Sequence, residues 1–217
     1  MQLLGHITLN ISLIVYLIWF IPQIFHNFKR KNTNGLSMLM IGILSIGYLC
    51  DLMYGFGREM QWQYRLVTLT GIGCLMIQNY QFGRYGLNHF KEKTVYISLN
   101  MIYVCLLIYA ILSINLSFSN KNGYDFFGMI AQVCWLSYMV PQIIKNAMNR
   151  STLGLSTSFV GLSILLNLCD FISAWTLNWD YPSKIGPAVT LSGHLVLFFQ
   201  MHYFARFSRE PVVLMAL

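Results

Sequence analysis

The chain has 217 residues, of which 56% are hydrophobic and 10% are charged, and its mean hydropathy is +0.56. A soluble domain carries about 25% charged residues, so this composition excludes an ordinary water-soluble fold. The net charge of +7 does not indicate nucleic-acid binding, because the basic residues are scattered between long apolar runs and suit a membrane surface better. We therefore expect an integral membrane protein whose surroundings are the lipid bilayer, with no nucleic-acid partner.

Seven apolar stretches are long enough to cross a bilayer, which takes about 20 residues. In chain order they cover residues 3–25, 36–56, 64–86, 94–118, 124–146, 155–177 and 184–206. No basic segment precedes the first stretch and no A-x-A site follows it, so a cleaved signal peptide is not expected. The predicted fold class is all-α and integral to the membrane, with seven transmembrane helices.

The basic residues predict an orientation in the membrane. Ten of the 14 Lys and Arg residues lie in the connections 26–35, 84–93 and 145–152 and in the C-terminal tail. The other four are Arg58, Arg65, Lys121 and Lys184. Positively charged connections remain in the cytoplasm, so we predict an extracytoplasmic N-terminus and a cytoplasmic C-terminus. The membrane is expected to be a bacterial inner membrane or that of a lysosome-like organelle.

The segment FIPQIFHNFKRKNTNGLS at residues 20–37 recurs as MVPQIIKNAMNRSTLGLS at residues 139–156. A shift of 119 residues without gaps gives twelve identities over the thirty positions 22–51. The identities include Pro, Gln, Asn, Gly and Asp, which two apolar helices do not share by chance, so we infer an internal repeat. Each unit then holds three helices, and the extra crossing between them makes the two units parallel. Transporters with parallel repeats hold their substrate near the middle of the membrane.

A Pro-Gln pair, an Asn four residues later, a basic turn and Gly-Leu-Ser, present twice in a seven-helix chain, resemble the PQ-loop family. That family includes the lysosomal cystine exporter, and the sugar-transporting SWEETs and the KDEL receptor share its fold. The resemblance implies two parallel triple-helix bundles joined by a linker helix (3+1+3). We place the first bundle at residues 1–90, the linker helix at 91–120, the second bundle at 121–210 and a cytoplasmic tail at 211–217.

Proline inside a membrane helix frees a backbone carbonyl and weakens the helix at that point. Pro22 and Pro141 lie near the predicted cytoplasmic ends of their helices, and the side chains of Gln23 and Gln142 can bond the freed carbonyls. The resemblance implies that the kinked helix opens and closes the cytoplasmic side. We therefore expect these four residues to form hinges; the alternative is that each proline only ends its helix.

Two of the seven acidic residues, Asp51 and Asp170, fall well inside a predicted helix. A carboxylate at such a place is energetically costly and marks a functional site by default. Together with His194 of the seventh helix, the two acids form the expected proton-coupling set. The alternative for each acid is a structural ion pair, of Asp51 with Arg65 and of Asp170 with Lys184.

Polar and aromatic side chains inside the spans or at their ends supply the candidate substrate contacts, which are Asn27, Asn79, Asn146, Asn167 and Trp175. Asn167 lies one helical turn before Asp170. For this reason we expect Asp170, rather than Asp51, to be the functional acid.

No zincin, nucleophile-elbow or Walker motif is present, so we expect no enzyme and no catalytic residues. The five cysteines lack C-x-x-C spacing, so we expect no metal and no cofactor. The expected function is secondary transport of a small polar metabolite, an amino acid or derivative, by alternating access; proton coupling and a homo-oligomer are left open. The alternatives are a non-transporting receptor or accessory protein of the same fold, like the KDEL receptor, and a SWEET-like sugar uniporter.

Overall fold

The computed structural model describes residues 1–60, 62–86, 90–115, 121–178 and 181–207, and within these ranges all regular structure is helical. The helices are α1 (Gln2–Ile18), α2 (Ile21–Arg30), α3 (Met38–Gly57), α4 (Trp62–Tyr85), α5 (Phe90–Asn115), α6 (Lys121–Ser137), α7 (Val140–Asn149), α8 (Thr157–Thr176) and α9 (Tyr181–Phe207). The predicted tail at 211–217 lies outside the described residues.

Among the described residues, seven helical segments are long enough to cross a bilayer. Five of them also meet the hydropathy of a membrane span: Gln2–Arg30, Met38–Gly57, Lys93–Leu112, Gly123–Asn149 and Thr157–Thr176. The other two, α4 and α9, are more polar but contain 24 and 27 residues. At about 1.5 Å per residue they exceed the roughly 30 Å of a bilayer core. The predicted all-helical, seven-span class is confirmed, and the chain is a multi-pass integral membrane protein.

The first and fifth crossings are each broken into two helices. α1 ends at Ile18 and α2 begins at Ile21, whereas the fifth crossing breaks between α6 and α7. Pro22 and Pro141 lie in the first turn of the second helix, where an N–H has no partner within the helix and its loss does little harm. Each proline thus starts a helix instead of ending one, and the break comes just before it.

The repeat extends to the backbone. Ser37 caps α3 by accepting a hydrogen bond from the Met40 amide at 3.3 Å, and Ser156 caps α8 in the same way. The described non-glycine residues with positive φ form two pairs separated by 119 positions, at 47–54°: Lys31 with Arg150, and Glu59 with Asn178. Such backbone angles are uncommon outside glycine, so their recurrence means that both units share one loop design.

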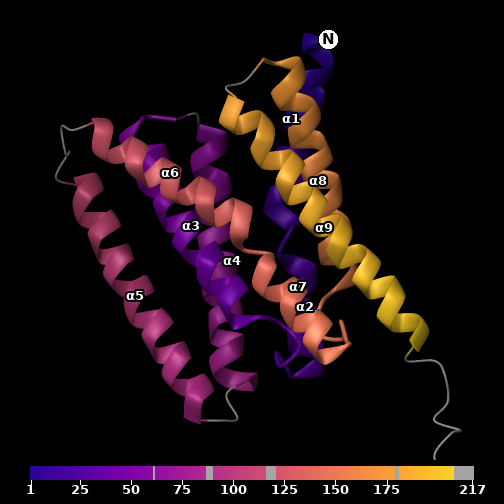
Figure 1. Ribbon diagram of the computed structural model, residues 1–217. Helices are drawn as coiled ribbons and strands as arrows, with labels where there is room; N and C mark the ends of the chain where they lie inside the picture. Colours follow the sequence, from indigo (N-terminus) through magenta and orange to yellow (C-terminus); the bar gives the residue numbers. More distant parts are fainter. Residues whose placement is uncertain (61, 87–89, 116–120, 179–180, 208–217) are drawn as a thin grey trace, which may run out of the picture.

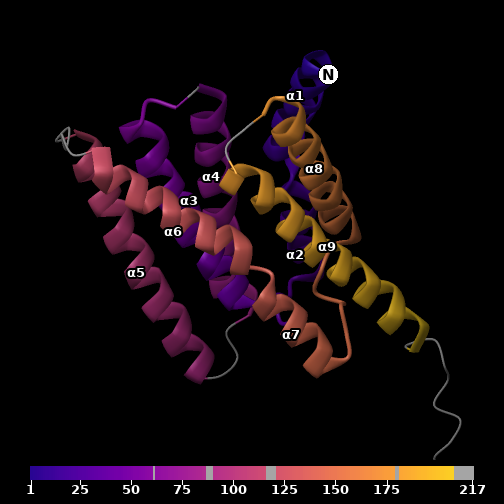
Figure 2. The ribbon, with the colours of Figure 1, turned by 45° about the horizontal axis from the view of Figure 1, so that its top comes forward.

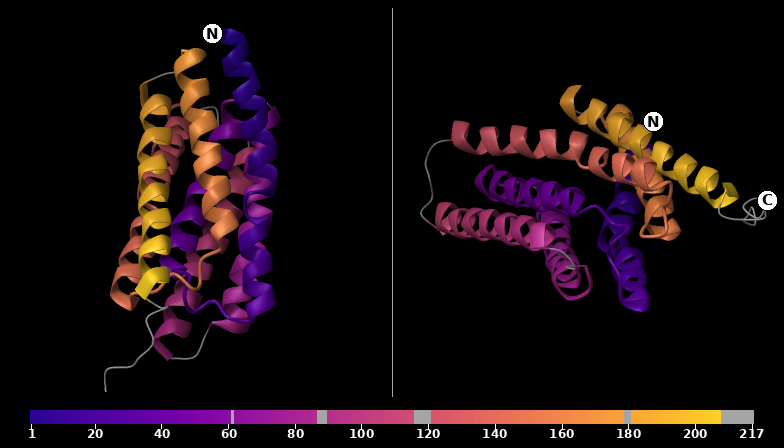
Figure 3. Two further views of the ribbon diagram at one scale, coloured as in Figure 1. Left: turned by 90° about the vertical axis from the view of Figure 1, so that its right-hand side faces the viewer. Right: turned by 60° about the horizontal axis from the view of Figure 1, so that its bottom comes forward.

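The two units run parallel and face each other. The short helices α2 and α7 lie at one end of the bundle and the N-terminus lies at the other (Figure 1); we call these the PQ end and the N-terminal end. Across the interface α1 packs along α8 and α3 packs along α6. α5 packs on α3 at the outside of the first unit, as Figure 2 also shows. Figure 3 shows α8 between α1 and α9, so one face of the second unit is covered by the first.

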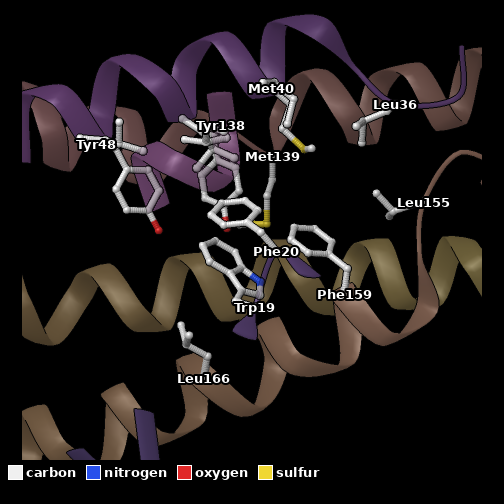
Figure 4. Close-up of a cluster of buried hydrophobic side chains, with 14 of the residues drawn as sticks. Trp19, Phe20, Leu36, Met40, Tyr48, Tyr138, Met139, Leu155, Phe159 and Leu166 are labelled. Atoms are coloured by element: carbon white, nitrogen blue, oxygen red, sulfur yellow. The ribbon is translucent and has the colours of Figure 1, made fainter. Parts of the chain in front are cut away.

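Aromatic side chains from the two helix breaks fill the middle of the interface (Figure 4). Trp19 and Phe20 come from the first break, and Tyr138 and Met139 occupy the equivalent positions of the second. All four are at most 3% exposed. Trp19 stacks on Phe159 of α8, with ring centroids 5.4 Å apart and an interplanar angle of 10°. The breaks therefore supply the core that joins the two units.

Candidate functional site

At the PQ end, the first Pro-Gln motif bonds the Gly-Leu-Ser loop of the other unit. The Gln23 Nε2 donates to the Gly154 carbonyl at 2.9 Å, and its Oε1 accepts from the Ser156 amide at 2.8 Å. Gln23 is 0% exposed. We expected this amide to bond the carbonyl freed by the proline of its own helix; instead it bonds the backbone of a distant loop.

The second motif makes the same two bonds in reverse. Gln142 Nε2 donates to the Gly35 carbonyl at 3.0 Å, and Gln142 Oε1 accepts from the Ser37 amide at 2.6 Å. Four hydrogen bonds thus join the two units reciprocally. We call Gln23, Gln142 and the loops 35–37 and 154–156 the PQ clasp.

Two predicted substrate contacts lie inside this network. Asn27 accepts from Gln23 Nε2 at 2.8 Å and donates to Gln81 Oε1 at 3.0 Å. Asn146 occupies the equivalent position in the second unit, where it donates to Gln200 Oε1 at 3.1 Å. Both asparagines are at most 1% exposed. In this conformation they hold the clasp glutamines in place and are closed off from any solute.

The backbones of the two Gly-Leu-Ser loops touch. A Cβ atom added to Gly35 would lie 2.5 Å from the Gly154 Cα, and one added to Gly154 would lie 2.3 Å from the Gly35 Cα. No side chain larger than hydrogen fits without moving the loops apart. The PQ end is therefore closed by backbone contact as well as by the clasp.

The two intramembrane acids, of which Asp51 is buried and Asp170 is half-buried, also bridge the units. Asp51 of α3 accepts from Tyr64 Oη of its own unit at 2.6 Å and from Trp135 Nε1 of α6 at 2.7 Å. Asp170 of α8 accepts from Tyr16 Oη of α1 at 3.0 Å. Tyr16 and Trp135 are equivalent positions of the repeat, so each acid is held by the first helix of the opposite unit.

Asp170 has a second partner on the same helix, because the Ser12 hydroxyl of α1 also donates to it. The carboxylates therefore differ: Asp51 is bonded to both units, whereas both partners of Asp170 belong to the unit across the interface. Charge-assisted hydrogen bonds of this kind are stronger than neutral ones.

The ion pairs considered as an alternative do not form. The Arg65 guanidinium lies 5.3 Å from the centre of the Phe56 ring. Lys184 donates to Asn178 at 2.8 Å and lies over the ring of Trp175. Among the described side chains the ion pair present is Arg58–Asp125, with 3.3 Å between Nε and Oδ1.

The N-terminal end is closed by small residues. Thr8 Oγ1 and Ser173 Oγ lie 2.7 Å apart between α1 and α8. A Cβ added to Gly5 would lie 2.4 Å from Thr176 Oγ1, and one added to Gly57 would lie 2.2 Å from the Tyr124 ring. Close approach of this kind is typical of membrane helix interfaces with small residues. The units are thus in contact at both ends.

A polar cluster lies between the two closed ends. His194 of α9 is 0% exposed, and its Nδ1 is 2.9 Å from the Thr190 carbonyl, so we assign the proton to Nδ1. Its Nε2 then accepts from Tyr138 Oη at 3.1 Å, next to the second helix break. Asn167 of α8 accepts from the Thr190 hydroxyl and donates to the Ser163 carbonyl at 2.7 Å. We call Tyr138, Asn167, Thr190 and His194 the central cluster.

The predicted Asn167 and His194 therefore meet, with Asn167 Nδ2 3.3 Å from His194 Nδ1. The first unit reaches this region through Trp19, whose Nε1 donates to Ser163 Oγ at 2.5 Å. Asp170 does not bond Asn167 or His194, so the expected neighbourhood of acid, amide and imidazole is not formed here.

The remaining candidates lie elsewhere. Asn79 donates to Asn100 of α5 at 3.0 Å and lines a cavity of about 10 Å³ on that side of the first unit. Trp175 is 58% exposed at the outer surface of α8. The five predicted substrate contacts are thus spread over the clasp, the central cluster, the linker side and the outer surface.

The partners of the two acids were not predicted from the sequence; they are Ser12, Tyr16, Tyr64 and Trp135. One signal was present, because the shift that aligns the two aspartates also aligns Tyr16 with Trp135. Both side chains carry a hydrogen-bond donor on an aromatic ring, although their residue types differ.

A sequence model of the PQ loop repeat matches residues 4–64 and 123–183, which together make up more than half of the chain. The chain belongs to the PQ-loop repeat family. Each matched segment contains one Pro-Gln motif, one Gly-Leu-Ser loop and one of the two intramembrane aspartates.

The fold of this PQ-loop protein is similar to that of a eukaryotic SWEET transporter. The match has a TM-score of 0.65 at 15% sequence identity and covers 95% of this chain and 98% of the other. The arrangement of two triple-helix bundles and a linker helix is therefore confirmed. Family and fold together support a membrane transporter.

Proposed function

We propose that this PQ-loop protein is a secondary transporter that moves a small polar metabolite, an amino acid or derivative, by alternating access. The observation that carries the proposal is the reciprocal PQ clasp. A static helical bundle needs no such arrangement, whereas a carrier needs one closure at each end that can be broken separately. The clasp supplies this closure at the PQ end, and the contacts of Thr8, Asp170 and Arg58 supply it at the N-terminal end.

The helix breaks suggest how the PQ end opens. α2 carries Gln23 and is joined to α1 only through Trp19 and Phe20, so it can swing while α1 stays packed on α8. A few residues at element ends commonly absorb such motions. Opening would break four hydrogen bonds and expose Asn27 and Asn146.

The central cluster is the proposed substrate site. It lies between the two closures, and Asn167 offers an amide there, with His194 as a second polar group. The aromatic side chains of the breaks cover it in this conformation, so a solute would enter only when one end opens. This assignment keeps Asn167 as a substrate contact and gives Asn27 and Asn146 a role in closing the site.

Proton coupling is proposed at Asp170, with Asp51 and His194 as further members of the set. Separation of α1 from α8 must take Ser12 and Tyr16 away from Asp170. A carboxylate left without these donors at the interface is unfavourable, and a proton would relieve the charge. Opening of the N-terminal end and protonation of Asp170 would then favour each other.

A SWEET-like sugar uniporter is the second candidate, because the fold resembles a SWEET transporter over nearly the whole chain. Such a uniporter would not need either aspartate to take up or release a proton during transport. The two candidates therefore differ in whether transport responds to pH.

The test is a thermal-shift screen of the purified protein with amino acids, sugars and nucleosides, followed by uptake of the stabilising solutes into proteoliposomes. We expect saturable uptake that is absent from empty liposomes. A solute that stabilises the protein without being taken up would favour the receptor or accessory alternative and overturn the proposal.

A further inference from the structure

Gln78 of α4 is a fully buried amide without partners. Its exposed fraction is 0%, and neither Nε2 nor Oε1 forms a hydrogen bond. Nearly all buried polar groups in proteins are hydrogen-bonded, because an unpaired one has lost water and gained nothing in exchange. Inside a membrane protein the penalty is larger still, since no solvent lies nearby. An amide kept in this state needs an explanation.

Gln78 lies in the buried core of the first unit, where α4 packs on α1, α2 and α3. Leu75 and Phe82, three residues before and four residues after it, share its helix face and belong to the buried cluster that contains the aromatic residues of the breaks. Gly71, two turns before, lies against the Tyr48 ring, and Gln81, one turn after, donates to the Ile24 carbonyl just beyond the first break. The amide therefore lies among apolar side chains level with the break.

A structural role does not account for the amide. Gln81 has its counterpart in Gln200, and the two make the same pair of bonds in their units, as expected of amides that the fold requires. The counterpart of Gln78 is Leu197, which is 1% exposed. The second unit thus fills the same place with an apolar side chain and packs well.

A different unpaired group in this structure has room for one water molecule beside it. The Tyr103 hydroxyl also lacks a partner, and Tyr103 lines the cavity of about 10 Å³ beside Asn79. A space of this size holds about one water. Gln78 does not line that cavity, so its amide must find its partner in another way.

We propose that Gln78 is a substrate-contacting residue, and that the substrate carries a neutral group, a hydroxyl or an amide, that both donates and accepts a hydrogen bond. Such a group satisfies Nε2 and Oε1 together, whereas a carboxylate would satisfy only the donor and an ammonium only the acceptor. The inference rests on the proposed transport function and narrows its substrate class. Bound substrate would supply the partners that the empty closed state lacks, so closure around substrate would be favoured over closure without it.

The first experiment compares thermal unfolding of the wild type, Gln78→Leu and Gln81→Leu in detergent without added solute. We expect Gln78→Leu to unfold at the same temperature as the wild type or higher, because it copies Leu197 and removes an unpaired amide. Gln81→Leu should unfold at a lower temperature, because it breaks bonds to Asn27 and Ile24. Equal destabilisation by both substitutions would show a structural partner for Gln78 and overturn the inference.

The second experiment measures uptake of glutamine, serine, alanine and glucose into proteoliposomes. For glutamine, serine or glucose we expect Gln78→Leu to raise KM roughly tenfold. A change of this size corresponds to the free energy of about one hydrogen bond. Alanine, which lacks a hydroxyl or amide in its side chain, should be a poor substrate for both proteins. Transport by the wild type with an unchanged KM in the variant overturns the inference alone. Transport of none of the four solutes by the wild type overturns the proposed function and the inference with it.

Discussion

Asp51 and Asp170 are equivalent residues of the repeat with different bonding. Asp51 is fixed within its own unit by Tyr64 and is 6% exposed, so one of its bonds survives any separation of the units. Asp170 depends on Ser12 and Tyr16, both of which lie across the interface. The charge of Asp170 is therefore tied to the contact between α1 and α8, and that of Asp51 is tied mainly to the fold.

We predict that Asp170→Asn abolishes the pH dependence of transport, whereas Asp51→Asn mainly lowers stability. An asparagine at position 170 cannot take up or release a proton. Its side-chain NH2 group would also place a hydrogen-bond donor opposite the donating hydroxyl of Ser12 or Tyr16. At 51 the same exchange places an amide donor against Tyr64 or Trp135 and should reduce the free energy of unfolding by about 1–3 kcal/mol. Uptake into proteoliposomes at several external pH values, together with thermal unfolding, measures both effects. A wild-type pH response in Asp170→Asn would contradict the assignment.

At the scale of elements, the important feature is that two crossings are each built from two helices. The break leaves α2 and α7 as ten-residue helices whose main contacts are with the clasp and with α4 or α9. Short helices joined through a break can move separately from the longer ones. Each short helix ends at a residue in the left-handed conformation, Lys31 after α2 and Arg150 after α7.

We predict that Pro22→Ala and Pro141→Ala reduce transport much more than they reduce substrate binding. Alanine restores an N–H to the first turn of α2 or α7, so that the broken crossing can become one continuous helix. A continuous helix would bias the protein toward one conformation. Uptake and thermal-shift binding of the same solute give the comparison. Full transport in the double variant would show that neither proline acts in a hinge.

We predict that Gly35→Ala pushes the PQ end open and lowers stability by about 1–3 kcal/mol. The added methyl group would lie 2.5 Å from the backbone of Gly154, which cannot rotate away. The matched control is Gly161→Ala in α8, where an added Cβ meets nothing within 4 Å. It should be neutral or stabilising by up to ~1 kcal/mol.

Spin labels at Asn34 and Leu153, one in each loop, report on this opening. The distance between the labels should lengthen in Gly35→Ala and stay unchanged in Gly161→Ala. Equal distance distributions in the two variants would mean that the loop contact does not keep the PQ end closed.

The whole molecule is a pseudo-symmetric pair of units in contact at both ends. The PQ clasp joins the units at one end and small residues join them at the other, while aromatic side chains fill the space between. The repeat makes the scaffold symmetric. The central cluster is asymmetric, because the position of the first unit that is equivalent to His194 holds Leu75. The symmetric scaffold therefore surrounds an asymmetric cluster.

We predict that the PQ end faces the cytoplasm and that the N-terminus is extracytoplasmic. The prediction rests on ten Lys and Arg residues on the PQ side against four on the other. Reporter fusions after Leu217 and within residues 118–123 measure the orientation. A fusion after Leu217 that reports an external location would reverse the orientation of the protein.

The class, the seven crossings and the repeat could all be predicted from the amino-acid sequence. These features depend on local properties: a bilayer demands about 20 apolar residues in a row, and a duplicated segment keeps its Pro, Gln, Gly and Asp at a constant spacing. The positions of Pro22 and Pro141 also predicted where the crossings break, to within about three residues.

Which side chains contact one another became known from the three-dimensional arrangement of the helices. Gln23 bonds a loop 131 residues away, and Asp170 bonds a tyrosine 154 residues away. Such contacts depend on how each helix is rotated about its axis and on which helix of the other unit it faces. Hydropathy and spacing carry no information on either quantity. From the sequence, an arginine fourteen residues from an aspartate and a tryptophan 84 residues from it are equally plausible partners of that aspartate. Packing of α1 against α8 and of α3 against α6 selected the aromatic donors and left Arg65, Lys184 and Trp175 at the periphery.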